Sequence, residues 1–163
     1  MKNSELKIEE VIRANTIDLD LEDVSNKNEI IDNLASLLDE AGLLNDKEKY
    51  IESVREREQM GPTYMEHFVA IPHGKSDAVY EAGIAFGRSK KGIFYETAFG
   101  GGVAKLIFLL AIPNRISGDA YMAVLARLAR LLVHQEFREE LMLATSYRDV
   151  VESIKKCERF LEE

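Results

Sequence analysis

The apolar run over residues 103–112 constrains the fold of this chain more than any other stretch. It reads VAKLIFLLAI, and every position after Lys105 is apolar. A strand buried on both faces has this composition, whereas a half-exposed strand alternates apolar and polar residues. The run is also far too short to span a bilayer as a helix. We therefore expect a central strand in a sheet whose two faces are both covered.

Helical and strand patterns alternate along the rest of the chain. Asn26 and Ser146 each begin a capping pattern ahead of an apolar stripe at helical spacing. We expect helices over 6–15, 26–41, 45 or 46–59, 118–133, 136–144 and 146–160, and strands over 16–21, 69–72, 79–87, 92–95 and 103–112. Because helices and strands interleave, the sequence predicts an α/β fold, in one domain, with a sheet covered by helices.

The amino-acid composition indicates which classes of partner are excluded and in which compartment the protein is expected. The formal net charge is −8, and no dense basic patch is present. This argues against binding to nucleic acid or to an anionic membrane surface. The chain has one cysteine, so it cannot form an internal disulfide, and no signal-peptide pattern is visible at its start. We therefore expect a cytoplasmic protein that does not insert into a membrane.

The stretch VAIPHGKSD, residues 69–77, delivers a histidine at the end of a predicted strand. His73 follows Pro72 and precedes Gly74, which predicts a turn with an open flank beside the imidazole. Ligand sites favour strand ends in α/β sheets, so the placement is consistent with a functional histidine. Such a histidine should be oriented, partly exposed and neutral near pH 7. A histidine that only caps the strand explains these residues equally well.

Two arginines close the helix that precedes this histidine. Arg57 lies three residues after Val54 and seven after Tyr50, so it points near the core-facing side of the helix. An inward-facing guanidinium can bind an anion as a planar fork. The helical angles favour Arg57 over Arg55 only slightly, and a solvated charge at the helix end is the alternative.

Other candidate sites have simpler interpretations. The glycines at 100–102 precede a strand, whereas a phosphate-binding P-loop follows one and ends in Gly-Lys-Ser/Thr, so we interpret them as a turn. This argues against an ATP-dependent kinase. Cys157 shares a helix face with Ile154 and Phe160, which predicts a packed thiol rather than a nucleophile.

A metal site is a weaker hypothesis. Glu66, His67 and His73 lie within eight residues, but no metal-binding spacing such as HExxH or a cysteine cluster is present, and nothing fixes a third ligand. His134 falls at a helix end, where a capping or surface role is commoner. We expect no bound metal and no cofactor.

The segment REREQMGPTYMEHFVAIPHGKSD, residues 55–77, resembles the active-site segment of enzyme IIA of the sugar phosphotransferase system, mannitol/fructose class. The resemblance continues through 104–113 and through LARLARLL at 125–132, and covers roughly 8–154. It implies one EIIA type-2 domain over 1–163, with a core of about 8–155 and a mixed β-sheet sandwiched between helices. The Pro-Thr-Tyr loop resembles mannitol-type members more than nitrogen-regulatory ones.

The resemblance also implies an activity. In this family the histidine at the His73 position is phosphorylated on Nε2 by phospho-HPr and then passes the phosphoryl group to a cysteine of enzyme IIB. Arg57 matches the active-site arginine, and Thr63 matches a loop threonine. The implied function is a phosphocarrier for uptake of a hexose or hexitol, which meets the membrane transporter through enzyme IIB. The Nδ1–H of His73 must then donate to an acceptor, and we expect a backbone carbonyl.

The chain departs from the family at one position of the predicted site. Members commonly carry a second histidine at the start of the long helix, and the alignment of LARLARLL puts Tyr121 there. A tyrosine can donate a hydrogen bond but cannot become cationic near pH 7. His67 is an alternative replacement for the second histidine. A regulatory, nitrogen-type protein that uses phosphorylation of His73 as a switch is the alternative function.

Overall fold

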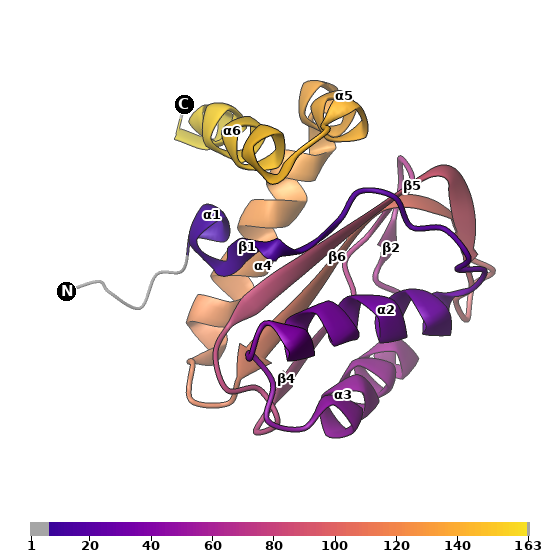
Figure 1. Cartoon of the computed structure of the whole chain (residues 1–163), viewed down its shortest axis with the longest axis vertical. Helices are drawn as coiled ribbons and strands as arrows, with labels where there is room; N and C mark the ends of the chain where they lie inside the picture. The colour runs from indigo at the N-terminus through magenta and orange to yellow at the C-terminus, as the bar shows by residue number, and fades with distance from the viewer. Residues whose placement is uncertain (1–6, 163) are drawn as a thin grey trace.

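The computed structural model describes residues 7–162 and contains one six-stranded mixed sheet (Figure 1). The strand order is β1-β5-β6-β3-β2, and β4 also pairs with β6. β5 and β6 are antiparallel, whereas β1 runs parallel to β5, and both β3 and β4 run parallel to β6. The strands are β1 (Ile12–Asp18), β2 (Tyr64–Met65), β3 (Val69–Ala70), β4 (His73–Ser76), β5 (Gly83–Tyr95) and β6 (Gly102–Pro113).

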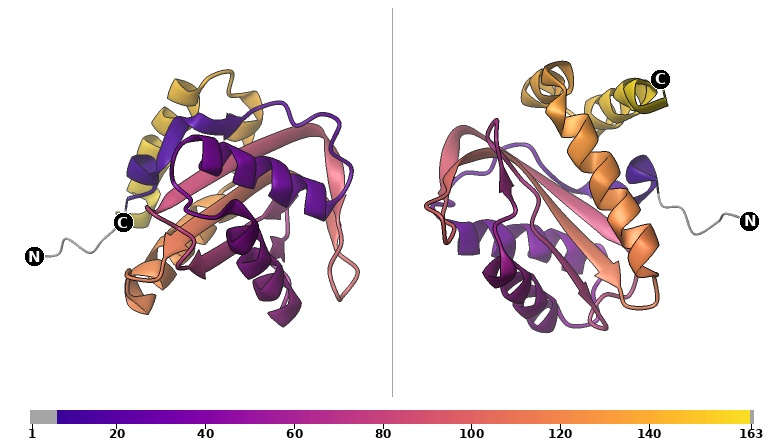
Figure 2. Two further views of the ribbon diagram at one scale, coloured as in Figure 1. Left: turned by 60° about the horizontal axis from the view of Figure 1, so that its bottom comes forward. Right: turned by 180° about the vertical axis from the view of Figure 1, so that it is seen from behind.

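Helices cover both faces of this sheet. Helices α2 and α3 lie against one face, and α4 crosses the other with α1, α5 and α6 beside it (Figures 1 and 2). The helices are α1 (Ile8–Val11), α2 (Lys27–Glu40), α3 (Lys47–Met60), α4 (Gly118–Val133), α5 (Gln135–Leu143) and α6 (Tyr147–Cys157), followed by the 3₁₀ helix η1 (Glu158–Glu162). The predicted α/β fold, with a mixed sheet between helices, is confirmed.

The central strand β6 divides the apolar interior into two cores. Side chains alternate across a strand, so Leu106, Phe108 and Leu110 enter the core under α4, whereas Ile107 and Leu109 enter the core under α2 and α3. All five are buried. Both faces of β6 therefore need apolar residues, which explains the apolar run over residues 103–112.

Capping residues set the starts of three helices, α2, α3 and α6, at the positions that the sequence predicted. Asn26 accepts a hydrogen bond from the Glu29 N–H, and Asp46 caps α3 in the same way. Ser146 accepts from the Asp149 N–H and begins α6. Each cap satisfies a backbone donor that has no partner within the helix.

The predicted start of the fold is wrong in part. The sequence predicted a helix over 6–15 and a strand over 16–21, but α1 has four residues and β1 begins at Ile12. Pairing with β5 overrides the helical pattern, because Ile12 lies opposite Ile84, and the buried Thr16 hydroxyl donates to the Ile84 carbonyl. Residue 6 lies outside the described residues. β-Branched side chains such as Ile12, Thr16 and Ile17 also suit a strand.

The strands predicted at 79–87 and 92–95 form one strand, β5, with an irregularity between Arg88 and Ile93. Residues 79–82 precede it. The glycines after β5 form the predicted turn, since Gly100 and Gly101 both have positive φ, and Gly102 already belongs to β6.

Candidate active site

His73 is the first residue of β4, where it lies opposite Leu110 of β6. The sequence predicted one strand through Pro72 and then a turn at the histidine, which is wrong. β3 ends at Ala70, and the strand is interrupted at Pro72, which has no N–H to donate. The break therefore comes just before His73, and pairing with β6 then fixes the backbone of the histidine.

Gly74 makes room for a helix rather than for solvent. A Cβ at this position would lie 2.4 Å from Ser53 Oγ, 3.0 Å from Val54 Cγ2 and 3.2 Å from Tyr50 Cε1. All three atoms belong to α3, so the glycine lets α3 pack closely against β4. The open flank predicted beside His73 is therefore wrong.

The imidazole of His73 is held in one tautomer. Its Nδ1 lies 2.9 Å from the Ile71 carbonyl oxygen, which can only accept, so Nδ1 carries the proton. In the neutral ring Nε2 is then the unprotonated nitrogen. This confirms the expectation that a backbone carbonyl receives the Nδ1–H. The residue is only 6% exposed, which is more buried than predicted.

Burial also lowers the pKa of His73 below its ordinary value. The positive charge of Arg57 acts in the same direction, whereas the hydrogen bond to Ile71 and the charge of Glu58 oppose it. The ring is therefore neutral near pH 7, with a lone pair on Nε2.

The structure separates the two arginines at the end of α3. Arg57 is half-buried, and its Nη1 donates to the Gly61 carbonyl at 2.9 Å. Its charge acts on His73. Arg55 instead forms an exposed ion pair with Asp32 at 3.3 Å. The two arginine side chains therefore have different surroundings, and of the two only the charge of Arg57 affects the pKa of His73.

Tyr121 contacts His73 edge to face. The two ring centroids are 5.7 Å apart, and the planes meet at 67°. Tyr121 lies in the first turn of α4, which Ser117 caps. Burial raises the pKa of the Tyr121 phenol, so this group is a neutral hydrogen-bond donor at physiological pH.

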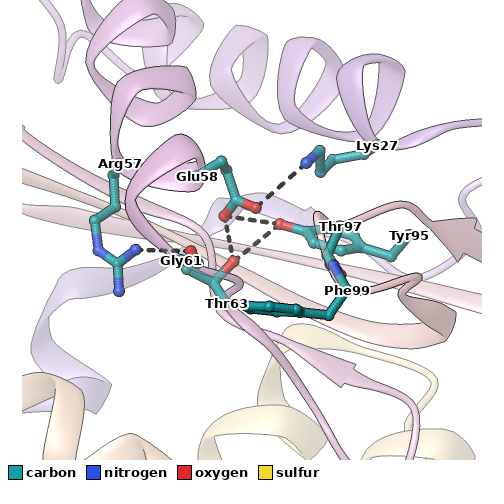
Figure 3. A network of polar contacts seen from close by, with 8 residues as sticks. All are labelled: Lys27, Arg57, Glu58, Gly61, Thr63, Tyr95, Thr97 and Phe99. Atoms are coloured by element: carbon teal, nitrogen blue, oxygen red, sulfur yellow. Dashed lines mark hydrogen bonds and ion pairs between the residues drawn. The ribbon is translucent and has the colours of Figure 1, made fainter.

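Thr63 belongs to a buried polar cluster next to the site (Figure 3). Its hydroxyl donates to Glu58 and lies 3.0 Å from the Tyr95 hydroxyl, and Lys27 reaches the same carboxylate at 3.5 Å. We refer to Lys27, Glu58, Thr63 and Tyr95 as the Glu58 cluster. Sequence reasoning missed its other three members, although the Arg57-Glu58 pair in the quoted motif was a signal for Glu58.

His67 lies away from His73. Val69 is opposite Leu106 and His73 is opposite Leu110, so four residues of β6, about 13 Å, separate even these two positions. His67 precedes Val69, and its nearest charged partner is Glu66 at 3.9 Å. The geometry does not support His67 as the replacement for a second histidine.

The remaining candidates fit structural roles. Within residues 7–162 no group of three His, Cys, Asp or Glu side chains could hold a metal ion. Cys157 is buried, as predicted, and burial raises the pKa of its thiol, which disfavours the reactive thiolate. His134 lies at the junction of α4 and α5, where its N–H closes α4 on the Leu131 carbonyl. Of the helices described, none is long and apolar enough to cross a membrane.

Known proteins are similar to this chain in sequence and in fold. Residues 10–157 match the family described as phosphoenolpyruvate-dependent sugar phosphotransferase system, EIIA 2. The fructose-specific EIIABC component of Bacillus subtilis is 35% identical over 94% of this chain, which spans only 24% of that protein's length. The fructose-specific EIIA component of Haloferax volcanii is 33% identical, over 77% of this chain and 80% of that protein.

A solved structure extends the similarity to the whole fold. The nitrogen regulatory protein IIA-Ntr from Neisseria meningitidis is 30% identical, with a TM-score of 0.78 over 90% of this chain and 98% of that one. Sequence and fold therefore point to the same family. The chain belongs to the EIIA type-2 family of the phosphoenolpyruvate-dependent sugar phosphotransferase system.

Proposed function

We propose that His73 accepts a phosphoryl group from phospho-HPr on Nε2 and passes it to a cysteine of an enzyme IIB, in the uptake of a hexose or hexitol. The observation that carries this proposal is the hydrogen bond from Nδ1 to the Ile71 carbonyl. It leaves Nε2 as the nucleophilic nitrogen. The lowered pKa of His73 keeps this nitrogen unprotonated.

The chemistry needs no nucleotide. In the first step the Nε2 lone pair of His73 forms a bond to phosphorus, and the bond from phosphorus to the donor imidazole breaks, its electron pair returning to the donor. The Ile71 carbonyl stabilises the positive charge that develops on the ring of His73. In the second step a thiolate of enzyme IIB attacks phosphorus, and the electron pair of the P–N bond returns to Nε2. The groups that exchange are close in energy, so positioning and charge stabilisation dominate catalysis.

Arg57 and Tyr121 supply donors for the phosphoryl oxygens in this proposal. The guanidinium offers charged donors in a planar fork, and the phenol offers one neutral donor. Tyr121 also lies in the first turn of α4, and helix N-termini favour anions. Thr63 takes part through its position in the loop, where its hydroxyl donates to Glu58.

The proposal is tested by incubating the purified chain with enzyme I, HPr and phosphoenolpyruvate. Intact-mass spectrometry should show one added phosphoryl group that is labile in acid and stable in base, as a phosphoramidate is. Addition of a fructose-type or mannitol-type enzyme IIB should then discharge it. Failure to take up a phosphoryl group while a known enzyme IIA does so in parallel would refute the proposal. If the protein transfers phosphoryl groups from HPr to an enzyme IIB, it does so in the cytoplasm.

Similarity to the nitrogen regulatory protein supports a second candidate function, a switch set by phosphorylation of His73. The same experiment separates the two functions. A transport protein discharges to an enzyme IIB within its catalytic cycle, whereas a switch holds its phosphoryl group in the presence of every enzyme IIB tested.

The lowered pKa of His73 predicts a specific pH dependence. Burial disfavours the charged ring, so the midpoint of its protonation should lie below the ordinary histidine pKa of about 6.5. At pH 6.5 more than half of His73 should therefore be neutral, and uptake from phospho-HPr should reach half of its maximum at a lower pH. An NMR titration of the His73 imidazole measures this directly. A midpoint above 6.5 would show that Glu58 and the Ile71 hydrogen bond outweigh burial.

Tyr121→Phe should slow phosphoryl uptake only modestly. The change removes one neutral donor and retains the ring that packs on His73. A neutral hydrogen bond contributes about 0.5–1.5 kcal/mol, which corresponds to roughly 2- to 12-fold in rate. Single-turnover kinetics with phospho-HPr would measure the change. A loss beyond 100-fold would mean that the hydroxyl acts as more than a single neutral donor.

A further inference from the structure

The segment 61–63 supports two of the three side chains that meet the phosphoryl group in the proposed function, Arg57 and His73. The Gly61 carbonyl accepts from Arg57 Nη1 at 2.9 Å. The Thr63 carbonyl accepts from the Ile71 N–H at 2.9 Å, and the Ile71 carbonyl accepts from His73 Nδ1 at 2.9 Å. A shift of this short segment would therefore move the support of the arginine and of the histidine together.

The carboxylate of Glu58 anchors this segment. Its Oε2 accepts from the Thr63 hydroxyl and from the Tyr95 hydroxyl, the latter at 3.1 Å. Its Oε1 faces Lys27 Nζ at 3.5 Å. These partners come from α2, the loop after α3, and β5, so one carboxylate joins three parts of the fold (Figure 3).

Burial makes the Glu58 carboxylate depend on these partners. The Glu58 side chain is only 5% exposed, and a buried carboxylate is stable only with charged or hydrogen-bonding partners. Burial and the adjacent carboxylate raise the pKa of Tyr95, so this phenol remains a donor. Gly61 has φ 156° and ψ 154°, a region that is nearly restricted to glycine, so this residue allows the chain to turn from α3 toward Thr63.

Arg57 and Glu58 are neighbours in sequence but act on different sides of the end of α3. Figure 3 shows Arg57 pointing away from the Glu58 cluster while its guanidinium contacts Gly61. Glu58 points to Thr63 and Tyr95. Arg57 can therefore face the reacting groups while Glu58 fixes the loop on which Arg57 and His73 both depend.

We propose that Glu58 is a positioning residue for phosphoryl transfer. Its buried carboxylate fixes the segment 61–63, and this segment in turn holds Arg57 and His73 in position around the same phosphoryl group. The inference rests on the proposed function, because it concerns transfer through His73. Glu58 acts through the loop and does not touch the phosphoryl group. Thr63, matched above to the loop threonine of the family, acts as its link.

The test compares Glu58→Gln with Glu56→Gln, a matched change at an exposed position two residues earlier on α3. Glutamine retains the shape and one acceptor, but it loses the charge that pairs with Lys27. We expect Glu58→Gln to slow single-turnover uptake about 10- to 100-fold, with KM for phospho-HPr within about twofold, because small misplacements reduce rates by this order. Glu56→Gln should match the wild type.

A second readout does not depend on activity. Nitrogen-15 NMR of the His73 ring should show the Nδ1–H tautomer alone in the wild type and a mixture of tautomers in Glu58→Gln. An unchanged tautomer together with a rate within twofold of the wild type would overturn the proposal. So would a lowered melting temperature with both readouts unchanged, since this describes a structural role alone.

Thr63→Val provides a separate route to the same result if Glu58→Gln does not fold. It removes the hydroxyl that links the loop to Glu58 and retains the backbone carbonyl that holds Ile71. The same slower uptake and mixed tautomers are expected, and wild-type values in both would refute the inference. If the wild-type chain takes up no phosphoryl group, the proposed function fails, while the NMR comparison still decides whether Glu58 orients His73.

Discussion

A His73→Ala variant is expected to take up no phosphoryl group from phospho-HPr. The change removes Nε2, the nitrogen that the Nδ1 hydrogen bond to Ile71 leaves free to attack. Among residues 7–162 the other histidines are His67 and His134, and neither lies in this site. Because the reaction needs a covalent acceptor, the expected loss is complete rather than partial.

The measurement is intact-mass spectrometry after incubation with enzyme I, HPr and phosphoenolpyruvate. His67→Ala is the matched control, since His67 is an exposed histidine at the far end of β6, and it should be labelled at the wild-type rate. Circular dichroism should show that both variants fold. Labelling of His73→Ala at the wild-type rate would place the phosphoryl group on another residue.

Arg57→Lys should retain the fold and slow phosphoryl uptake about 30- to 1000-fold. Lysine keeps the charge but loses the planar fork, and it cannot reproduce both the contact to the Gly61 carbonyl and a contact to the phosphoryl oxygens. A lost charge-assisted hydrogen bond in the transition state costs roughly 2–4 kcal/mol, which gives this range. Stopped-flow or quenched-flow transfer from phospho-HPr would measure it.

Arg55→Lys is the matched control for this prediction. Arg55 forms an exposed ion pair with Asp32, and exposed ion pairs contribute little to the stability of the fold. Its rate should remain within about twofold of the wild type. An Arg57→Lys rate within threefold of the wild type would show that Arg57 is a surface charge, and a loss in Arg55→Lys instead would reverse the assignment of the two arginines.

Much of the fold follows from local sequence patterns. The run at 103–112 must be buried on both faces, so it predicts the central strand. Asn26, Asp46 and Ser146 begin their helices because each supplies an oxygen to an unpaired N–H. The N-terminal region differs from its predicted helix because Ile12 pairs with Ile84. These two residues are far apart in the sequence, so a local pattern does not reveal their pairing.

For the site, the sequence by itself singled out His73, and it indicated Arg57 because helical spacing directs one arginine inward. Resemblance to the family added Thr63 and Tyr121. Tertiary structure decided the rest, because the contacts join segments far apart in the chain. It packs Tyr121 against His73, leaves His67 at the other end of β6, and fills the flank at Gly74 with α3. The Glu58 cluster likewise became visible only when α2, α3 and β5 buried one carboxylate among them, since burial is what makes a charged group require partners.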